Sequence, residues 1–373
     1  MGRFPQSIAI AGAWGYIGGK FLEAARALRL RTFVYDPGTP PHDLDLRGVM
    51  RFTNEDHFYR NPADLFHLAV HPAQRKTGMA ILLERAANYP TAILCEKPMA
   101  PPEQPEECLR IVEAVNRSGA VVLYDFPELF DPLTRRIFDF LSGFKTVEIT
   151  QMVVQRSKNR ESRSNPRNLK RMVHIQYQES VHCLAFVLNL LATLKKSIEA
   201  VFAGGLWIES SSEPYHAPNP KEYPHVVDGK CDYILSLGGT MVTGITNFKK
   251  GAEAIKRRTI VGVGDGKEFV IDANYQEDSK HLLITGVRQD YDPATNSYEK
   301  VIETLGEWYE NVGAQALMSG VYPNPSFARL TYQLSSVLWR SCWDKQRITL
   351  ASLDELKTFD ARFAAEIPNM PRY

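Results

Sequence analysis

The chain has 373 residues, a length that fits two domains better than one, and its 44% hydrophobic and 23% charged residues exclude a disordered or fibrous protein. The 44 basic and 43 acidic side chains leave a net charge of +1, so neither nucleic acid nor a membrane surface is predicted as a partner. No run approaches the roughly 20 apolar residues that cross a bilayer. The 5 cysteines are scattered without a Cys-x-x-Cys pair, which favours reduced thiols, a cytoplasmic location and no metal site.

Short apolar runs alternate with helical segments over the first third of the chain. Runs typical of buried strands cover residues 7–11, 31–35, 65–70, 91–95 and 120–124, with a weaker one at 49–52. Helical periodicity covers residues 20–28, 76–88 and 105–118. This alternation predicts a doubly wound parallel sheet with helices on both faces. We therefore expect a Rossmann-type domain at residues 1–126 and a second domain at residues 127–373.

A glycine-rich turn follows the first strand. Gly12, Gly15 and Gly18 recur at intervals of three between strand and helix, where amides at a helix N-terminus bind the pyrophosphate of a dinucleotide. Asp36 ends the second strand, where a carboxylate accepts hydrogen bonds from ribose hydroxyls and repels a 2′-phosphate, so NAD is favoured over NADP. The predicted cofactor-binding residues of this turn and strand are Gly12, Ala13, Trp14, Gly15, Tyr16, Ile17 and Asp36.

Two residues of the turn leave alternatives open. Ala13 takes the place of a glycine in the G-x-G-x-x-G fingerprint, so a tight turn without a ligand is the competing interpretation. Trp14 either shields the pyrophosphate or stacks on adenine, or else packs against the domain surface.

Beyond the turn, the residues resemble a known family. Leu65–Pro72 (LFHLAVHP) and Ala92–Ala100 (AILCEKPMA) are similar to the Gfo/Idh/MocA (glucose–fructose oxidoreductase / inositol dehydrogenase) family. Its hallmark is a Glu-Lys-Pro triplet after the fifth strand, here Glu96-Lys97-Pro98. Residues 258–272 and 316–341 resemble its late hairpin and closing segment more loosely. The resemblance implies an α/β Rossmann domain followed by an α+β domain, an open, mostly antiparallel sheet with helices on one face.

Lys97 is the candidate acid/base. It follows a strand of the predicted sheet, and ligands of such sheets bind in the crevice at the carboxyl ends of the strands. An ammonium there can exchange a proton with a substrate hydroxyl or carbonyl; the alternative is an ordinary solvated lysine. Glu96 can hold the ribose or tune the lysine, and Pro98 is a candidate for a cis peptide bond. The resemblance places Val70 and His71 in the wall of the cofactor pocket.

A second set of candidates begins a predicted helix in the second half, which extends from Gln178 to about residue 194. The resemblance implies an Asp-x-Gly-x-His motif here that reaches the substrate. This chain keeps His182 but has Gln178 in place of the aspartate, and the i, i+4 spacing puts both on one helix face. His182 is therefore a candidate catalytic residue, and Tyr177, Gln178 and His182 are candidate substrate ligands.

The loss of the aspartate leaves the proton-transfer chemistry open. Gln178 can orient an imidazole but cannot supply charge. Either Lys97 carries the transfer nearly alone, or Glu179 or Tyr177 contributes, or catalysis has been lost.

Residues 156–171 (RSKNRESRSNPRNLKR) form a basic, polar stretch. A solvated loop is the favoured interpretation, and a lid or a patch for an anionic substrate is the alternative.

The resemblance implies an NAD(P)-dependent oxidoreductase that transfers a hydride between a nicotinamide cofactor and a sugar, polyol or related hydroxy compound. It also implies a homodimer or homotetramer. The main alternative is a catalytically silent member that binds the cofactor and acts as a ligand sensor or protein partner. A further alternative is other chemistry on the same fold, such as glycosidic cleavage through transient oxidation.

Overall fold

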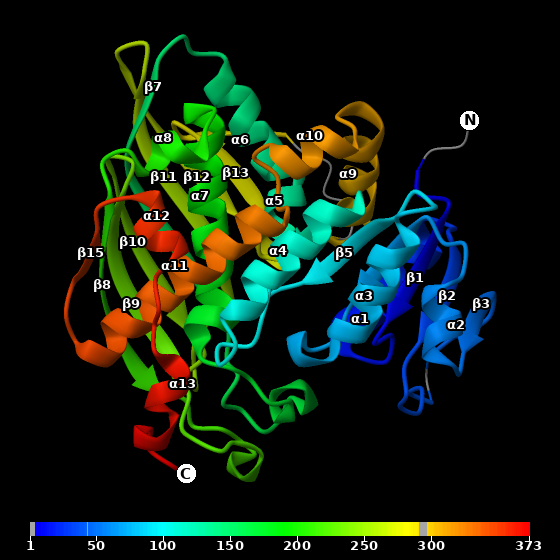
Figure 1. Cartoon of the computed structure of the whole chain (residues 1–373). Coiled ribbons are helices and arrows are strands. Elements are labelled where there is room, and N and C mark those ends of the chain that lie inside the picture. Colours follow the sequence, from blue (N-terminus) through cyan, green and yellow to red (C-terminus); the bar gives the residue numbers. More distant parts are fainter. Residues whose placement is uncertain (1–3, 43, 291–296) are drawn as a thin grey trace. The chain divides into compact units, whose positions relative to one another are not determined.

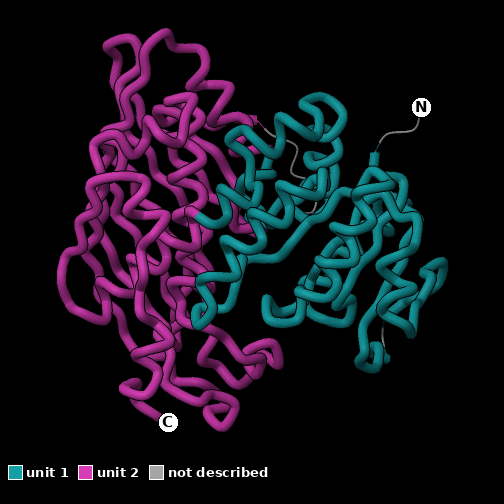
Figure 2. Tube along the Cα trace, viewed as in Figure 1, with its two compact units in different colours: residues 1–131, 294–329 teal, residues 132–293, 330–373 magenta. Residues whose placement is uncertain are grey.

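The computed structural model describes residues 4–42, 44–290 and 297–373, and these divide into two compact units (Figure 2). Unit 1 contains residues 1–131 and 294–329, and unit 2 contains residues 132–293 and 330–373. The chain therefore returns to unit 1 after most of unit 2 has been built. The sequence predicts that all residues beyond 126 form a second domain. The structure differs most at residues 294–329, which belong to unit 1.

Unit 1 is built on a six-stranded parallel sheet with the strand order β3-β2-β1-β4-β5-β6. Every residue of the inner strands β1, β4 and β5 is buried, as expected for short apolar runs covered on both faces. The strand order reverses between β1 and β4, and ligands of doubly wound sheets bind at such a switch point. The strands are β1 (Ser7–Ala11), β2 (Arg31–Tyr35), β3 (Val49–Phe52), β4 (Leu65–Leu68), β5 (Ala92–Glu96) and β6 (Val121–Asp125).

Helices cover both faces of this sheet (Figure 1). α1 packs with α9 in one layer, and α2, α3 and α4 are successive neighbours in the other. The edge strand β6 is covered as well, because Tyr124 N donates to Pro323 O at 2.7 Å. The helices of unit 1 are α1 (Tyr16–Ala27), α2 (Glu55–Tyr59), α3 (Lys76–Arg85), α4 (Glu106–Ser118), α5 (Pro127–Phe130), α9 (Ser297–Asn311) and α10 (Ala314–Ser319), with a 3-10 turn η1 (Pro72–Gln74).

Unit 2 is built on a nine-stranded sheet with the order β14-β13-β12-β11-β7-β10-β9-β8-β15. All neighbouring strands are antiparallel except β7 and β10, which are parallel. Burial alternates along the long strands, so one face is covered and the other is open. The strands are β7 (Val147–Ser157), β8 (Leu206–Pro214), β9 (Asp228–Leu237), β10 (Thr240–Asn247), β11 (Ile255–Gly264), β12 (Lys267–Asn274), β13 (His281–Ile284), β14 (Val287–Arg288) and β15 (Ile348–Leu350).

Three long helices cover the buried face of this sheet (Figure 1). Phe140 of α6 packs edge-on against Phe269 of β12, and Ser341 of α11 accepts a hydrogen bond from Ser210 N of β8 at 3.1 Å. α7 lies between them and is buried along most of its length. The helices are α6 (Pro132–Ser142), α7 (Val181–Lys195), α8 (Ile198–Phe202), α11 (Pro325–Asp344), α12 (Leu353–Lys357) and α13 (Phe363–Glu366), with a π-helix η3 (Gln176–Ser180) and 3-10 turns η2 (Pro166–Leu169), η4 (Pro220–Glu222), η5 (Glu277–Ser279) and η6 (Ile367–Asn369).

The predicted fold class is confirmed, including the weak strand at residues 49–52. Two segments differ from the expectation. The helix predicted to begin at Gln178 begins as the π-helix η3 and becomes regular only at Val181. The basic stretch is not simply a solvated loop, because Arg156 and Ser157 belong to β7 and Arg160 is only 7% exposed.

Candidate functional site

The turn after β1 has room for backbone only. Gly12 has a φ of +77°, and a Cβ there would lie 2.7 Å from both Ala69 O and Val70 Cγ1. A Cβ on Gly18 would lie 2.1 Å from Gly12 O, so the start of α1 packs directly on the turn. The N-cap of α1 is Gly15, which has no side chain to cap the first-turn amides. This close cradle and its N–H groups fit a pyrophosphate.

Asp36 organises the same turn from the end of β2. Its Oδ2 accepts Trp14 N at 3.0 Å, and its Oδ1 accepts Gly38 N at 2.8 Å. The Trp14 indole donates to Gly38 O at 3.1 Å, and the Arg51 guanidinium lies 5.7 Å from the Trp14 ring. Each carboxylate oxygen retains a second lone pair, so Asp36 can still accept hydrogen bonds from ribose hydroxyls.

Arg75 joins the two loops that follow β4 and β5. Its Nε donates to Val70 O and its Nη1 donates to Pro98 O, both at 2.9 Å. Arg75 is 6% exposed, and burial lowers the pKa of its guanidinium. The Lys97–Pro98 peptide bond is cis, as the sequence analysis anticipated. Sequence reasoning missed Arg75, because nothing local marks an arginine whose partners lie on two separate loops.

Glu96 and His67 form a buried pair on β5 and β4. His67 Nε2 lies 3.3 Å from Glu96 Oε1, and the ring is completely buried. Burial lowers the pKa of His67, so we assign the imidazole as neutral with Nε2 donating. Burial alone would raise the pKa of Glu96, but His67, Lys97 and Asp125 lower it below its usual value. An ionised carboxylate therefore stands directly before Lys97, which is partly exposed.

His71 lies at the end of the same edge of unit 1. It is exposed, and its Nδ1 accepts Ala73 N at 3.3 Å as the cap of the 3-10 turn η1. The structure thus brings the turn residues, Asp36, Val70, His71, Glu96 and Lys97 to the carboxyl edge of one sheet. The donor set and the shape of this edge fit a dinucleotide, with the glycine turn for the pyrophosphate and Asp36 for the ribose.

The candidate residues of unit 2 lie on the π-helix and the first turn of α7. π-helical turns are rare and often occur at functional sites. Gln178 is partly exposed, whereas His182 is 4% exposed and Tyr177 is 1% exposed. The Tyr177 hydroxyl donates to Ser336 Oγ at 3.0 Å. Gln178 and His182 flank Glu179, a buried carboxylate that the sequence analysis weighed only as a substitute for the lost aspartate.

Glu179 is the centre of a charged cluster. Arg156 Nε donates to its Oε1 at 2.5 Å, and Lys158 Nζ lies 2.9 Å from the same oxygen. Glu179 is 2% exposed. Burial lowers the pKa of Lys158 well below its usual range, although Glu179 opposes this effect. Both basic residues come from the stretch for which a solvated loop was the favoured interpretation.

Neither a metal site nor a membrane span is found in the part of the chain that the structure describes. No three His, Cys, Asp or Glu side chains among residues 4–42, 44–290 and 297–373 form a group that could hold a metal ion. None of the helices in these ranges is long and apolar enough to cross a bilayer.

Comparisons with solved structures agree with this architecture. A myo-inositol dehydrogenase from Corynebacterium glutamicum matches with a TM-score of 0.63 and 16% identity, over 92% of this chain and 98% of that one. GenD2 from gentamicin A biosynthesis, solved with NAD, matches with a TM-score of 0.64 and 12% identity, over 92% and 96%. The chain has the fold of the Gfo/Idh/MocA-type dehydrogenases.

The same fold also includes a regulator. A super-repressor mutant of Gal80p from Saccharomyces cerevisiae matches with a TM-score of 0.69 and 13% identity, over 95% of this chain and 100% of that one. No protein-family model matches the sequence, and a search of curated proteins found no match. At these identities the likeness establishes the fold.

Proposed function

We propose that the protein is an NAD-dependent oxidoreductase that acts on a sugar, polyol or related hydroxy compound. The observation that carries the proposal is the position of Lys97 after β5, on the edge of the sheet where β1 leads into the glycine turn. GenD2, which has this fold, was solved with NAD. NAD is favoured over NADP because the Asp36 carboxylate at the end of β2 repels a 2′-phosphate.

The proposed roles follow from the chemistry of each side chain. The glycine turn and Asp36 would hold the dinucleotide, and a bound nicotinamide would supply the acceptor for the hydride that leaves the carbinol carbon of the substrate. Lys97 takes the hydroxyl proton as the carbonyl forms, and returns it in the reverse direction. Val70 and His71 line the cofactor, and Glu96 holds the ribose or tunes Lys97. His182 and Gln178 donate hydrogen bonds to the substrate.

The test compares wild type with Lys97→Ala and with Lys76→Ala, an exposed lysine at the start of α3. Absorbance of reduced nicotinamide is followed with NAD and a pooled panel of sugars, polyols and their acids. We expect Lys97→Ala to lower turnover by about 10²–10⁴-fold while NADH affinity, followed by fluorescence, stays within a few-fold. Turnover that persists in Lys97→Ala but not in a Gly12→Val variant would show that the lysine assignment is wrong while the cofactor assignment holds.

A second candidate function is a cofactor-dependent sensor without turnover. The replacement of the expected aspartate by Gln178 favours it, and Gal80p shows that a regulator can have this fold. A sensor binds NADH in the wild type, shows no turnover with any member of the panel and is unaffected in NADH affinity by Lys97→Ala. Turnover by the wild type excludes this candidate.

We also propose a homodimer or homotetramer formed through the open face of the nine-stranded sheet. Large apolar side chains are exposed there, with Ile234 on β9 at 46%, Met241 on β10 at 40% and Val270 on β12 at 44%. Ile234→Lys should reduce the mass measured by light scattering to that of the monomer. A multimer that survives this substitution contradicts the proposed interface.

A further inference from the structure

Strand pairing brings basic residues together on the covered face of the sheet in unit 2. Arg156 on β7 pairs with Lys256 on β11 and with Thr246 on β10. Directly paired residues point to the same side of a sheet, so the two cationic side chains and the Thr246 hydroxyl form one row. Ser180 of the π-helix packs on this row, with its Oγ 2.7 Å from Thr246 Oγ1. The row therefore lies beneath the segment that carries Gln178 and leads to His182.

The segment after β7 adds three more cations, Lys158, Arg160 and Arg167, near this row. Lys158, Arg160 and Lys256 each interact electrostatically with both Glu179 and Arg167. The Phe248 ring lies between two of them, 5.2 Å from Lys158 Nζ and 5.8 Å from Arg160 Cζ. We call this set the cationic cluster: Arg156, Lys158, Arg160, Arg167 and Lys256.

The carboxylates in contact with the cationic cluster do not neutralise all of it. Glu179 forms ion pairs with Arg156 and Lys158. Lys256 has no carboxylate within ion-pair distance among the described residues, and Glu277, which acts on it at longer range, is exposed. Arg160 is 7% exposed, and its Nε has no hydrogen-bond acceptor in the part of the chain described. A buried guanidinium N–H without an acceptor is costly unless a ligand supplies one.

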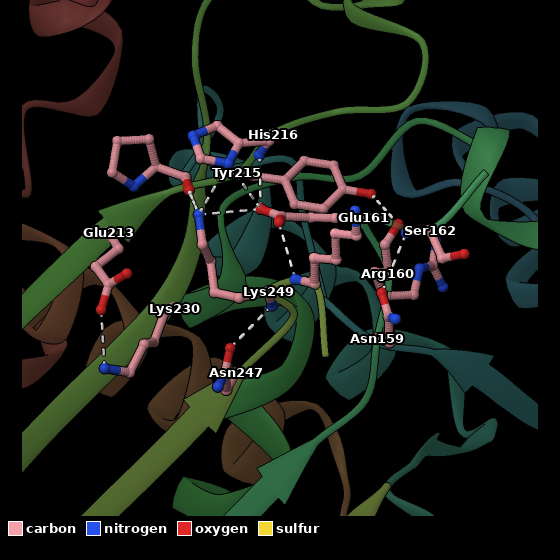
Figure 3. A network of polar contacts seen from close by, with 12 residues as sticks. Asn159, Arg160, Glu161, Ser162, Glu213, Tyr215, His216, Lys230, Asn247 and Lys249 are labelled. Carbon is pink, nitrogen blue, oxygen red and sulfur yellow. Dashed lines mark hydrogen bonds and ion pairs between the residues drawn. The ribbon is translucent and has the colours of Figure 1, made fainter. Parts of the chain in front are cut away.

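The segment that carries Arg160 is fixed by contacts with residues 215–216 and 249–250 (Figure 3). The Tyr215 hydroxyl donates to Arg160 O at 2.7 Å. The next residue, Glu161, accepts His216 N at 2.8 Å and Lys250 N at 2.9 Å and forms an ion pair with Lys249 at 3.0 Å. Burial alone would raise the pKa of Glu161, but these hydrogen bonds and Lys249 lower it. The backbone of Arg160 is therefore held in place before any ligand binds.

We propose that the cationic cluster binds an oxyanion of the substrate, so that the hydroxy compound oxidised or reduced by this protein carries a carboxylate or a phosphate. The inference rests on the proposed function and narrows its substrate class to sugar acids, polyol acids or their phosphate esters. Lys256 and Arg160 supply donors that the chain itself leaves unsatisfied, and Arg167 supplies further positive charge. Glu179 keeps Arg156 and Lys158 in position and is not displaced.

The electrostatics of Lys256 agree with an anionic ligand. Burial, followed by repulsion from Arg156, lowers the pKa of the Lys256 ammonium to about 8. An oxyanion beside it removes much of this penalty, because an opposite charge within a few ångströms favours the charged form. Charge-assisted hydrogen bonds to a carboxylate or phosphate are also roughly twice as strong as neutral ones.

The test uses calorimetric titration of the full chain with three probes: inorganic phosphate, D-gluconate and neutral sorbitol. Lys256→Met removes the charge and keeps the length of the side chain, and Lys256→Arg restores the charge. Lys267→Met is the matched control, because Lys267 is exposed at the start of β12, in the same hairpin. We expect Lys256→Met to weaken binding of the preferred anion by roughly 10- to 100-fold, Lys256→Arg to recover most of this loss, and Lys267→Met to have no effect.

Each result bears on the proposal. Gluconate bound more tightly than phosphate indicates a carboxylate substrate, and the reverse order indicates a phosphate ester. Sorbitol bound as tightly as the anions, no binding of either anion, or equal anion affinities in wild type and Lys256→Met would each overturn the proposal. NADH binding is measured on the same samples by fluorescence. If the wild type binds the anion but does not bind NADH, the proposed oxidoreductase function is refuted and the anion site is not.

Discussion

The Asp36 carboxylate holds the backbone of Trp14, whose N–H donates to Oδ2 at 3.0 Å. The contact links the end of β2 to the turn between β1 and α1, two parts of the chain 22 residues apart. The other oxygen, Oδ1, accepts Gly38 N at 2.8 Å. One side chain thus fixes the shape of the proposed pyrophosphate turn and places a negative charge where the adenosine ribose would lie.

Asp36→Asn should therefore change the choice of cofactor. Asparagine keeps one acceptor oxygen for the backbone but loses the charge that attracts ribose hydroxyls and repels a 2′-phosphate. We expect NADH affinity to fall by about tenfold and the preference for NADH over NADPH to decrease, because the affinity for NADPH falls less or rises. Fluorescence titration with both cofactors measures this ratio. Asp45→Asn is the control, because Asp45 pairs with Arg26 and Arg47 on the surface of the same unit; an unchanged ratio in Asp36→Asn would contradict the assignment.

The glycines at the start of α1 allow a paired test of the turn. A Cβ on Gly18 would lie 2.1 Å from Gly12 O, whereas the nearest atom to a Cβ on Gly19 lies 3.9 Å away. Gly18→Ala should destabilise the protein by about 1–3 kcal/mol or more and weaken NADH binding, because the turn must move. Gly19→Ala should be neutral or stabilising by up to about 1 kcal/mol, because alanine favours the helix. Thermal denaturation compares the melting temperatures of the two variants. Equal melting temperatures would show that Gly18 does not pack closely on Gly12 O.

The parallel sheet of unit 1 could be predicted from sequence because its signals are local. Short apolar runs, the glycine turn, Asp36 and the Glu96-Lys97-Pro98 triplet each occupy a few consecutive residues. The sheet predicted from the apolar runs and the cis bond before Pro98 are confirmed, whereas the roles of the glycine turn, Asp36 and Lys97 stay predictions. The structure adds to this pattern the order in which the strands pair. The return of residues 294–329 to unit 1 has no such signal, because it depends on packing between α1 and α9, which are far apart in the chain.

The cationic cluster could be predicted only in part: a patch for an anionic substrate at residues 156–171 is one of the two interpretations of that stretch, but the contribution of Lys256 depends on packing between distant segments. Arg156 and Lys256 meet only because β7 pairs with β11, and nothing in either segment marks the register. The basic composition of residues 156–171 favours a solvated loop, which agrees with the exposure of residues 163–166 and 169–171, but Arg156 and Arg160 at the start of the stretch are buried. The π-helix was missed because its single extra residue per turn leaves almost no trace in the hydrophobic pattern.

Glu179→Gln should be strongly destabilising. The carboxylate is 2% exposed and pairs with Arg156 and Lys158, so its removal takes away the negative charge that both cations contact. Breaking a buried pair in this way typically costs about 3–5 kcal/mol. Urea denaturation measures the loss, and phosphate in the buffer should recover part of it if the cationic cluster binds oxyanions.

The control for this prediction is Glu209→Gln. Glu209 pairs with Arg347 in an exposed ion pair, with side chains 58% and 53% exposed, and such pairs contribute little. We expect a change within about 0.5 kcal/mol. Similar losses in the two variants would show that Glu179 has no special role in compensating the cluster.

The ionisation of Lys256 should make the free energy of unfolding depend on pH. Its pKa is lowered from 10.5 to about 8 by burial and by Arg156, while Glu277 and Glu179 oppose this and Arg167 adds to it. Between these two values the unfolded chain binds more protons at this position than the folded chain, so the contribution of Lys256 to stability rises with pH. The difference between the two pKa values corresponds to roughly 3 kcal/mol of folding stability. This penalty on the folded state is fully present below pH 8 and is relieved as the pH approaches 10.5.

Lys256→Met removes this penalty at every pH. The stability of Lys256→Met relative to wild type should therefore be greatest near pH 7 and should decrease steadily toward pH 10, whereas the relative stability of Lys267→Met, at an exposed site, should stay nearly constant. Urea denaturation at pH 7, 8, 9 and 10 gives both curves. Taking each variant relative to wild type cancels the titration of the buried tyrosines and cysteines, which all three proteins share. A relative stability of Lys256→Met that does not change with pH would mean that the ammonium is already compensated, and the main electrostatic reason for an oxyanion ligand would be lost.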